Sequence, residues 1–238
     1  MSLDAGITDS FTLTIQPLNE LSLSEQSFKF NPLRDCPVLK KQLSRINALN
    51  QRLSRTQKDS HHQQKLTVKL RKGYLRLTHL KDEIAHKLIR LLRLAGRVAF
   101  QDEMIQGWHS GWYGKQVQHN VLGRVYAHLR AQAISQPLIY KQVARHVPTS
   151  QVCVCGRRVK KSLKDRIHQC QFCRIELDRD TLSSDLMNWQ TQGWDVLCLK
   201  EKDLFERMSL LDHMATSGTE TPPISECDKI LRKLLPLF

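Results

Sequence analysis

Short alternations of apolar and polar residues open the chain. They run over Leu3–Ile7, Phe11–Gln16 and Leu21–Phe30, with polar turn residues between them. A period of two predicts half-buried strands, and three such strands in succession predict an antiparallel meander. Pro32 and Pro37 interrupt the pattern, so we expect the meander to end before them.

After Pro37 the apolar residues recur with the spacing of an α-helix. A first stripe begins at Val38, and a second follows the polar loop Lys58–Ser60. Two long helices joined by a short loop predict an antiparallel helical hairpin. The apolar positions are Leu39, Leu43, Ile46 and Leu53 in the first helix and Leu66, Leu70, Leu77, Leu80, Ile84, Leu88 and Leu91 in the second.

The rest of the chain mixes the two periods. Arg97–Gln101 and Leu138–Ala144 are short apolar runs typical of buried strands, whereas Gly111–Ser135 has a helical pattern. A last helix is predicted from Asp180. The tail beyond Gln190 contains a stretch rich in Ser, Thr, Glu and Pro, which we expect to be flexible.

Positive charge is concentrated in the predicted hairpin. The chain carries a formal charge of +14, and the segment from Lys40 to Arg97 holds sixteen Lys or Arg residues against three Asp or Glu. Such a basic stripe favours contact with nucleic-acid phosphates, in an interaction that weakens with salt. The alternative is a solvated helix face. The candidate nucleic-acid contacts are Arg45, Arg52, Arg55, Lys58, Lys65, Lys69, Arg71, Lys72 and Arg76.

Two cysteine pairs lie between the last predicted strand and the last helix. Cys153 and Cys155 are separated from Cys170 and Cys173 by a basic linker. This arrangement predicts a zinc ribbon, with four thiolates around one structural Zn²⁺; the alternative is a set of reduced cysteines in a decayed module. His168 is a candidate to replace a poorly placed sulfur.

The cysteines also bear on localisation. Seven cysteines in a chain without a secretion signal favour a reducing compartment, where metal ligation is more common than disulfide formation. No apolar run is long enough to cross a membrane. We therefore expect a cytoplasmic protein without a membrane partner.

Carboxylates fall at three places in this order of elements. Asp4 lies in the first strand, Asp102 and Glu103 end the fourth, and Asp178 and Asp180 begin the last helix. Three antiparallel strands followed by strand, helix, strand and helix predict an α/β, ribonuclease-H-like mixed sheet, in which these places converge. Three such carboxylates can hold two Mg²⁺ or Mn²⁺ ions that activate water for phosphodiester cleavage.

Six short motifs occur in a fixed order: Leu3–Ile7, Gln51–Arg55 with His86 and Lys87, Phe100–Trp108, Trp112–Gly114, Pro148–Gln151 and Asp178–Asp180. Together they resemble the RuvC-like nuclease half of the transposon-encoded TnpB/OrfB family, which comprises RNA-guided endonucleases related to type V CRISPR effectors. The resemblance implies a DNA endonuclease of transposition with catalytic Asp4, Glu103 and Asp180. It also implies that the basic hairpin and the zinc ribbon are insertions in a RuvC-like sheet.

The chain departs from the family pattern at the middle carboxylate. An ungapped alignment of Phe100–Trp108 puts Gln101 at the family's glutamate, and a neutral amide supplies no anionic ligand. Glu103, two residues further along an extended strand, would face the same side of the sheet. We expect Glu103 to be the ligand; the alternative is an inactive site.

Further departures concern the first and third acidic motifs and the ribbon. Family members carry a guide-binding half ahead of the first acidic motif, which begins here at residue 3, so the resemblance implies guide RNA only with a separate N-terminal half. The Cys153–Gly156 knuckle is one residue shorter than in the family. In the third motif, Leu182, Ser183 and Ser184 stand where the family commonly has Asn and two small residues. Asp180 matches the catalytic position and Asp178 is a candidate helix cap. Asp185 is expected to be solvated; the alternative is that it reaches the metal site from the same face.

Two functional readings follow, an active DNA endonuclease core and a nuclease-inactive nucleic-acid-binding remnant or repurposed protein of the same family. A zinc-ribbon scaffold for ribosomal or messenger RNA ranks behind both, because it leaves the carboxylates unexplained. The predicted organisation is residues 1–36 for the first strands, 37–96 for the hairpin, 97–147 for the continued core, 148–177 for the ribbon, 178–192 for the last core helix and 193–238 for the tail.

Overall fold

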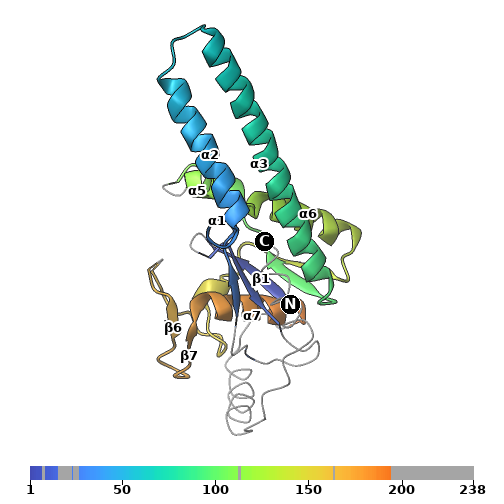
Figure 1. The fold of residues 1–238 in the computed structure, drawn as a ribbon. Coiled ribbons are helices and arrows are strands. Elements are labelled where there is room, and N and C mark those ends of the chain that lie inside the picture. Colours follow the sequence, from blue (N-terminus) through green and yellow to red (C-terminus); the bar gives the residue numbers. More distant parts are fainter. Residues whose placement is uncertain (7–8, 16–22, 24–26, 112–113, 163, 194–238) are drawn as a thin grey trace.

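A five-stranded mixed sheet lies at the centre of the molecule (Figure 1). Its order is β3-β2-β1-β4-β5; β2 runs antiparallel to β1 and β3, while β4 runs parallel to β1 and β5. The strands are β1 (Ser2–Ala5), β2 (Phe11–Thr14), β3 (Phe28–Phe30), β4 (Val98–Gln101) and β5 (Tyr140–Val143). The predicted α/β class is confirmed. The structure, a computed structural model, describes residues 1–6, 9–15, 23, 27–111, 114–162 and 164–193.

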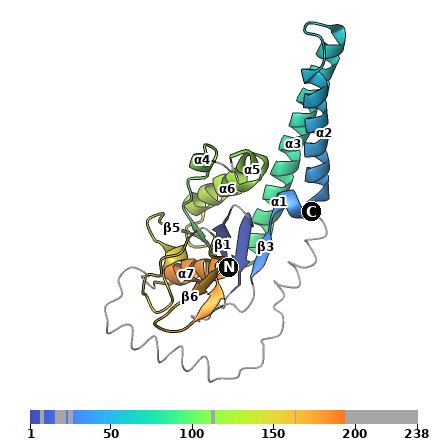
Figure 2. The same cartoon turned by 90° about the vertical axis from the view of Figure 1, so that its left-hand side faces the viewer.

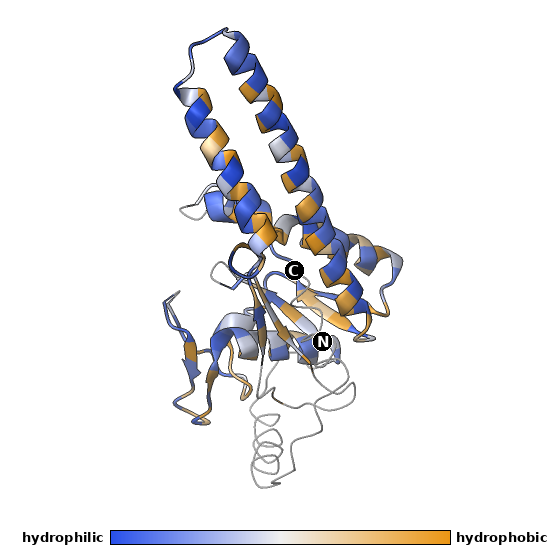
Figure 3. Ribbon diagram, viewed as in Figure 1, coloured by the Kyte–Doolittle hydropathy of each residue, from blue (hydrophilic) through white to orange (hydrophobic). Residues whose placement is uncertain are grey.

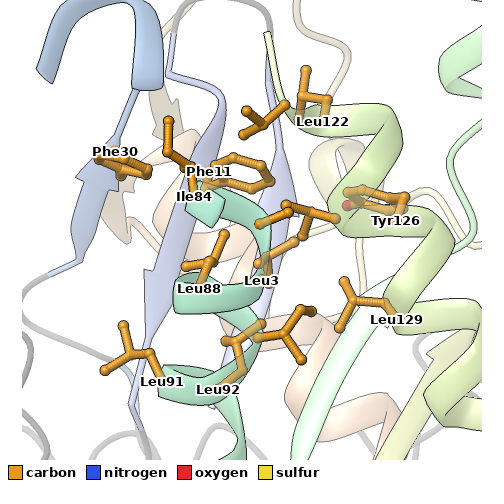
Figure 4. Close-up of a cluster of buried hydrophobic side chains, with 14 of the residues drawn as sticks. Leu3, Phe11, Phe30, Ile84, Leu88, Leu91, Leu92, Leu122, Tyr126 and Leu129 are labelled. Carbon is orange, nitrogen blue, oxygen red and sulfur yellow. The ribbon is translucent and has the colours of Figure 1, made fainter. Parts of the chain in front are cut away.

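Two helices cover one face of the sheet with apolar side chains. They are α3 (His61–Arg93) and α6 (Leu122–Ser135). Leu3 is paired with Leu13 of β2 and with Phe100 of β4, and all three side chains are buried in the cluster that Figure 4 shows. Burial of such side chains away from water is the main driving force that holds these layers together.

The opposite face is covered by α7 (Arg179–Thr191) through small hydroxyl residues. The Ser184 hydroxyl lies 3.0 Å from that of Ser2 and 3.1 Å from that of Thr14, which themselves are 2.7 Å apart. Because these side chains are short and satisfy one another, the helix can approach the strands closely. The start of α7 is thereby brought next to the end of β1.

The predicted helical hairpin is formed by α2 (Pro37–Ser54) and the first half of α3, and it projects from the sheet as an arm (Figures 1 and 2). Gln42 Nε2 donates a hydrogen bond to the Gly73 carbonyl at 2.8 Å. A Cβ at Gly73 would lie 3.4 Å from Ile46, in ordinary van der Waals contact, so the two helices cross closely at this point. At the base of the arm, Lys81 Nζ donates to the Gln118 carbonyl at 2.6 Å.

Several predicted boundaries differ from the structure. The predicted helix Gly111–Ser135 is wrong: two helices, α5 (Gly114–His119) and α6, meet at Asn120, whose Oδ1 accepts a hydrogen bond from Val121 N at 2.8 Å. A side chain that bonds to its neighbouring backbone competes with the helix in this way. The short helices α1 (Pro32–Asp35) and α4 (Ile105–Trp108) were not anticipated.

Some predictions lie outside the described residues. They concern Trp112 and Tyr113, the tail from residue 194, and most of the strand expected over Leu21–Phe30, of which β3 is the described part. None of the described helices is both long enough and apolar enough to cross a membrane.

A second, two-stranded sheet carries the cysteine segment. Here β6 (Ile167–Gln169) pairs antiparallel with β7 (Glu176–Asp178), and a 3-10 turn, η1 (Thr149–Gln151), precedes the first cysteine pair. The register places Ile167 opposite Asp178. Since β7 ends at Asp178 and α7 begins at Arg179, the cysteine segment leads directly into α7.

Candidate functional site

The four predicted cysteine ligands converge. Cys153, Cys155 and Cys170 are buried and Cys173 is half-buried, and their sulfur atoms all lie within 4.8 Å of one another. The sulfurs of Cys153 and Cys173 are 3.4 Å apart, and those of Cys155 and Cys170 are 3.7 Å apart. A tetrahedron with Zn–S bonds of 2.3 Å has edges of about 3.8 Å, so the group could hold one metal ion such as zinc.

Two tight turns present these sulfurs. In the first, Gly156 N donates to the Cys153 carbonyl at 2.8 Å, and Gly156 has a φ of 81°. In the second, Cys170 N donates to the Ile175 carbonyl at 3.0 Å, and Arg174 has a φ of 57°. Positive φ at one residue lets each turn close tightly. The shortened first knuckle therefore still directs both of its cysteines to the cluster.

The chemistry of the thiols also suits a metal. The hydrogen bond from Cys153 lowers the pKa of Cys155, which favours its thiolate form. Burial raises the pKa of Cys173 to about 11. Since a cation lowers the pKa of each thiol that it binds, an ion at this position would relieve the cost of crowding these groups.

His168 is not part of the cysteine group. It is fully buried on β6, and Lys161 Nζ lies 2.6 Å from its Nδ1. Burial, together with the charge of Lys161, lowers the pKa of His168 to about 4. With all four sulfurs within reach of one another, no replacement ligand is needed.

The first predicted carboxylate, Asp4, lies near the end of β1 and faces α7. The Ser183 hydroxyl of α7 hydrogen-bonds to it. Burial raises the pKa of Asp4 to about 8, and the charges of Asp180 and Glu103 add to the rise. Asp4 is thus within electrostatic reach of both other carboxylates predicted from the sequence.

Asp180, in the first turn of α7, is held by two arginines. Arg166 Nη1 lies 3.3 Å from one carboxylate oxygen and Arg179 Nε 3.1 Å from the other. Arg166 is the residue before β6, so this ion pair connects the cysteine segment to α7. Sequence reasoning missed Arg166 because its position depends on the pairing of β6 with β7.

Glu103 does not lie in an extended strand as predicted, because β4 ends at Gln101. Two arginines hold the segment that follows β4. Arg130 Nη2 and Arg145 Nη2 each lie 3.0 Å from the Asp102 carboxylate. Arg130 also donates to the Glu103 carbonyl. Glu103 is half-buried, and burial raises its pKa, with the charge of Asp102 acting in the same direction.

Gln101 is a buried structural residue. Its Nε2 donates to the Val147 carbonyl at 2.6 Å, and its Oε1 accepts from Thr149 Oγ1 at 3.1 Å. Thr149 Oγ1 is in turn 2.9 Å from Ser183 Oγ. A hydrogen-bonded chain therefore runs from Gln101 to the hydroxyl that contacts Asp4, and a glutamate here would meet the Val147 carbonyl with a second acceptor.

The other aspartates of α7 have distinct roles. Asp178 is the N-cap, accepting from Thr181 N at 2.9 Å, and it pairs with Lys29 at 2.7 Å, so its predicted role as a cap is confirmed. The prediction of a solvated Asp185 is wrong, because this residue is fully buried. The reason is that every residue from 180 to 189 is buried, which leaves α7 no solvated face in this stretch.

The basic residues of the arm are all exposed. The nine candidates named from the sequence lie on α2, α3 and the loop between them, and in the described residues none of them forms an ion pair. Figure 3 shows hydrophilic residues over most of this arm. Their charge is therefore available to an anionic partner.

Among the described residues, the four cysteines are the only group of three or more metal-binding side chains close enough together to hold one ion. The Asp4, Glu103 and Asp180 carboxylates do not form such a group, and arginines at Asp180 and Asp102 compensate part of the negative charge in this region. Comparison of the chain with models of protein families and with curated proteins gives no match.

Proposed function

We propose that this chain is a RuvC-like nuclease core of the TnpB/OrfB type, which cleaves DNA phosphodiesters with divalent metal ions. The observation that carries the proposal is the placement of Asp4 at the end of β1 against the first turns of α7, where it is hydrogen-bonded to Ser183 and its pKa is raised by burial and by the charges of Asp180 and Glu103. These residues come from a strand, a loop and a helix that are far apart in the sequence. Buried carboxylates are costly to gather unless a cation compensates them.

The sheet supports this proposal. Its order, β3-β2-β1-β4-β5 with β2 as the antiparallel strand, is the order expected of a ribonuclease-H-like sheet. Because β1 and β4 are parallel neighbours, Asp4 and the segment that carries Glu103 follow from the same edge of the sheet. The arm and the cysteine segment fit the two insertions that the resemblance implies.

The carboxylates and Arg166 have different roles in the proposed site. Bound among carboxylates of this kind, divalent ions activate a water molecule and stabilise the leaving oxygen of a phosphodiester. Asp4 and Asp180 are held by β1 and α7, which the hydroxyl contacts lock together. Arg166, whose side chain is 44% exposed beside Asp180, is positioned to bind a DNA phosphate.

The proposal predicts that Asp180→Asn lowers the Mn²⁺-dependent cleavage rate of single-stranded DNA by at least about a hundredfold, because a neutral amide binds the ion weakly. Asp178→Asn is the matched control, since asparagine caps a helix as well as aspartate does. It should retain cleavage within a few-fold. The measurement is the single-turnover rate on a labelled oligonucleotide. Equal rates for wild type and Asp180→Asn would reject the assignment.

A second candidate function is nucleic-acid binding without cleavage. It is favoured by Gln101, whose amide is fully engaged with Val147 and Thr149 and supplies no charge to the carboxylate site. On this proposal the exposed basic arm is the functional surface and the carboxylates are a remnant. Salt-sensitive binding together with absent cleavage in wild type would favour this candidate over the nuclease.

Both candidates predict that Lys69→Gln with Lys72→Gln weakens binding to single-stranded DNA, because these exposed lysines share one face of α3. The loss of two phosphate contacts should reduce the slope of log affinity against log salt by about 1.4. Lys115→Glu on α5 changes the net charge by the same amount outside the arm, and it should leave the slope unchanged. Fluorescence anisotropy at several salt concentrations measures both, and equal slopes for all three proteins would rule out the arm as the contact surface.

A further inference from the structure

The Asp180 carboxylate is bound by two arginines at once. Arg166 Nη1 donates a hydrogen bond to one carboxylate oxygen at 3.3 Å, and Arg179 Nε donates to the other oxygen at 3.1 Å. Asp180 is buried, so these two contacts account for much of what surrounds its charge. A divalent ion at either oxygen would therefore compete with the positive charge of an arginine.

The backbone of the cysteine segment holds the two arginines side by side. Arg179 N donates to the Arg166 carbonyl at 2.7 Å, next to the pair in which Ile167 of β6 lies opposite Asp178 of β7. Arg179 Nη1 also donates to the Ser162 carbonyl at 3.3 Å. The hairpin of β6 and β7 thus delivers two guanidinium groups to one carboxylate.

The contact between Arg166 and Asp180 is suited to exchange. A charge-assisted N–H···O bond is typically about 2.7–2.9 Å long, and the nearby pair of Lys29 with Asp178 has a distance of 2.7 Å. The Arg166 contact is longer and involves a single nitrogen. The Arg166 side chain is also 44% exposed, against 14% for Arg179. Arg166 is therefore the partner that can leave Asp180 and turn toward a ligand in solvent.

The charge of the surrounding segment favours an anionic ligand. Residues 157–166 contain six Lys or Arg residues and one Asp. Such a segment attracts phosphate groups, and the planar guanidinium of an arginine can bind two phosphate oxygens together. A nucleic-acid phosphate thus offers Arg166 a better partner than its single contact with Asp180.

We propose that Arg166 exchanges between Asp180 and a nucleic-acid phosphate, so that a divalent ion and the phosphate bind cooperatively. Without the ion, Arg166 is engaged with Asp180 and contributes little to nucleic-acid binding. With an ion at Asp180, Arg166 is displaced toward the phosphate. By linkage, the phosphate strengthens binding of the ion by the same factor. The inference rests on the proposed nuclease site and adds to it a control of metal loading by the substrate.

The test is the affinity for a labelled single-stranded oligonucleotide, measured by fluorescence anisotropy with and without Ca²⁺ at constant ionic strength. Ca²⁺ also binds carboxylate oxygens, and it replaces Mg²⁺ here to slow cleavage. Arg166→Gln should weaken binding by less than about twofold without Ca²⁺ and by about tenfold with Ca²⁺.

Lys164→Gln is the matched control. It removes the same charge from an exposed residue of the same segment, and Lys164 forms no ion pair among the described residues. Its effect on oligonucleotide affinity should be the same with and without Ca²⁺. A Ca²⁺-dependent effect equal to that of Arg166→Gln would overturn the exchange, because the dependence would then be general to the segment.

Asp180→Asn separates the inference from the proposed function. If Ca²⁺ strengthens oligonucleotide binding in wild type but not in Asp180→Asn, the metal site stands. An equal effect of Arg166→Gln in the two conditions would then overturn only the exchange of Arg166. If Ca²⁺ changes the affinity of wild type and Asp180→Asn equally, both proposals are wrong.

Discussion

Replacing Cys155 with serine is expected to abolish zinc binding and to unfold the segment from Thr149 to Asp178. Cys155 is fully buried, and its sulfur lies 3.7 Å from that of Cys170. A structural zinc site contributes apparent binding free energy of about 10–16 kcal/mol in small zinc domains, which is as large as the whole free energy of unfolding of a typical domain. Metal analysis of purified protein should give one zinc per wild-type chain and none per variant chain.

Cys36→Ser is the control for this substitution. Cys36 is also buried, but it lies at the N-cap of α2, outside the cysteine group, and serine is a favourable residue there. This variant should retain its zinc. Hydrogen exchange would locate the unfolding in Cys155→Ser, with loss of protection in β6 and β7. Full zinc content in Cys155→Ser would contradict the assignment of these ligands.

The metal-free carboxylate site should make the protein less stable as pH rises. The pKa of Asp4 is raised from 3.8 in the unfolded chain to about 8 in the folded protein. Between these values the folded protein retains a proton that the unfolded chain has released, so the free energy of unfolding falls as pH increases. From pH 6 to pH 8 the decrease is roughly 2–3 kcal/mol, at about 1.36 kcal/mol per pH unit.

Urea unfolding of zinc-loaded protein without Mg²⁺ measures this decrease. Asp4→Asn should remove it and should raise the unfolding midpoint at pH 8, because the amide carries no charge to bury. Added Mg²⁺ should stabilise wild type at pH 8 and have little effect on Asp4→Asn. Asp59→Asn is the control, since Asp59 is exposed at the tip of the arm with a φ of 60°, a conformation that asparagine adopts readily. A wild-type profile parallel to that of Asp4→Asn would refute the assignment.

The elements with the longest apolar stripes were predicted best from the sequence. The helices of the arm begin and end close to the predicted positions, because Pro37 starts α2 and Ser60 caps α3 by accepting from Gln63 N at 3.1 Å. Capping residues and helical periodicity are local signals. For the same reason β1 was found from its alternating pattern, and β4 and β5 were found from short apolar runs.

What could not be predicted depends on contacts between distant segments. The break at Asn120 involves a hydrogen bond from its Nδ2 to Ser10, which is 110 residues away in the chain. Asp185 looked solvated because the polar residues around it suggested an exposed helix, whereas serines at 183 and 184 in fact let α7 pack against the sheet. The pairing of Arg166 with Asp180 likewise follows only from the assembled fold.

The second helix of the arm is continuous with the core. At 1.5 Å per residue, the 33 residues of α3 span about 50 Å without interruption, from the tip of the arm to the apolar cluster under β1. Lys81 and Gln42 fasten this rod where it leaves the core and where it crosses α2. The second half of α3 is thus packed in the core, and its first half projects from it as part of the same helix. A strand of nucleic acid held along it would be presented at a fixed angle, and a sideways load on the tip would be transmitted as torque to β1.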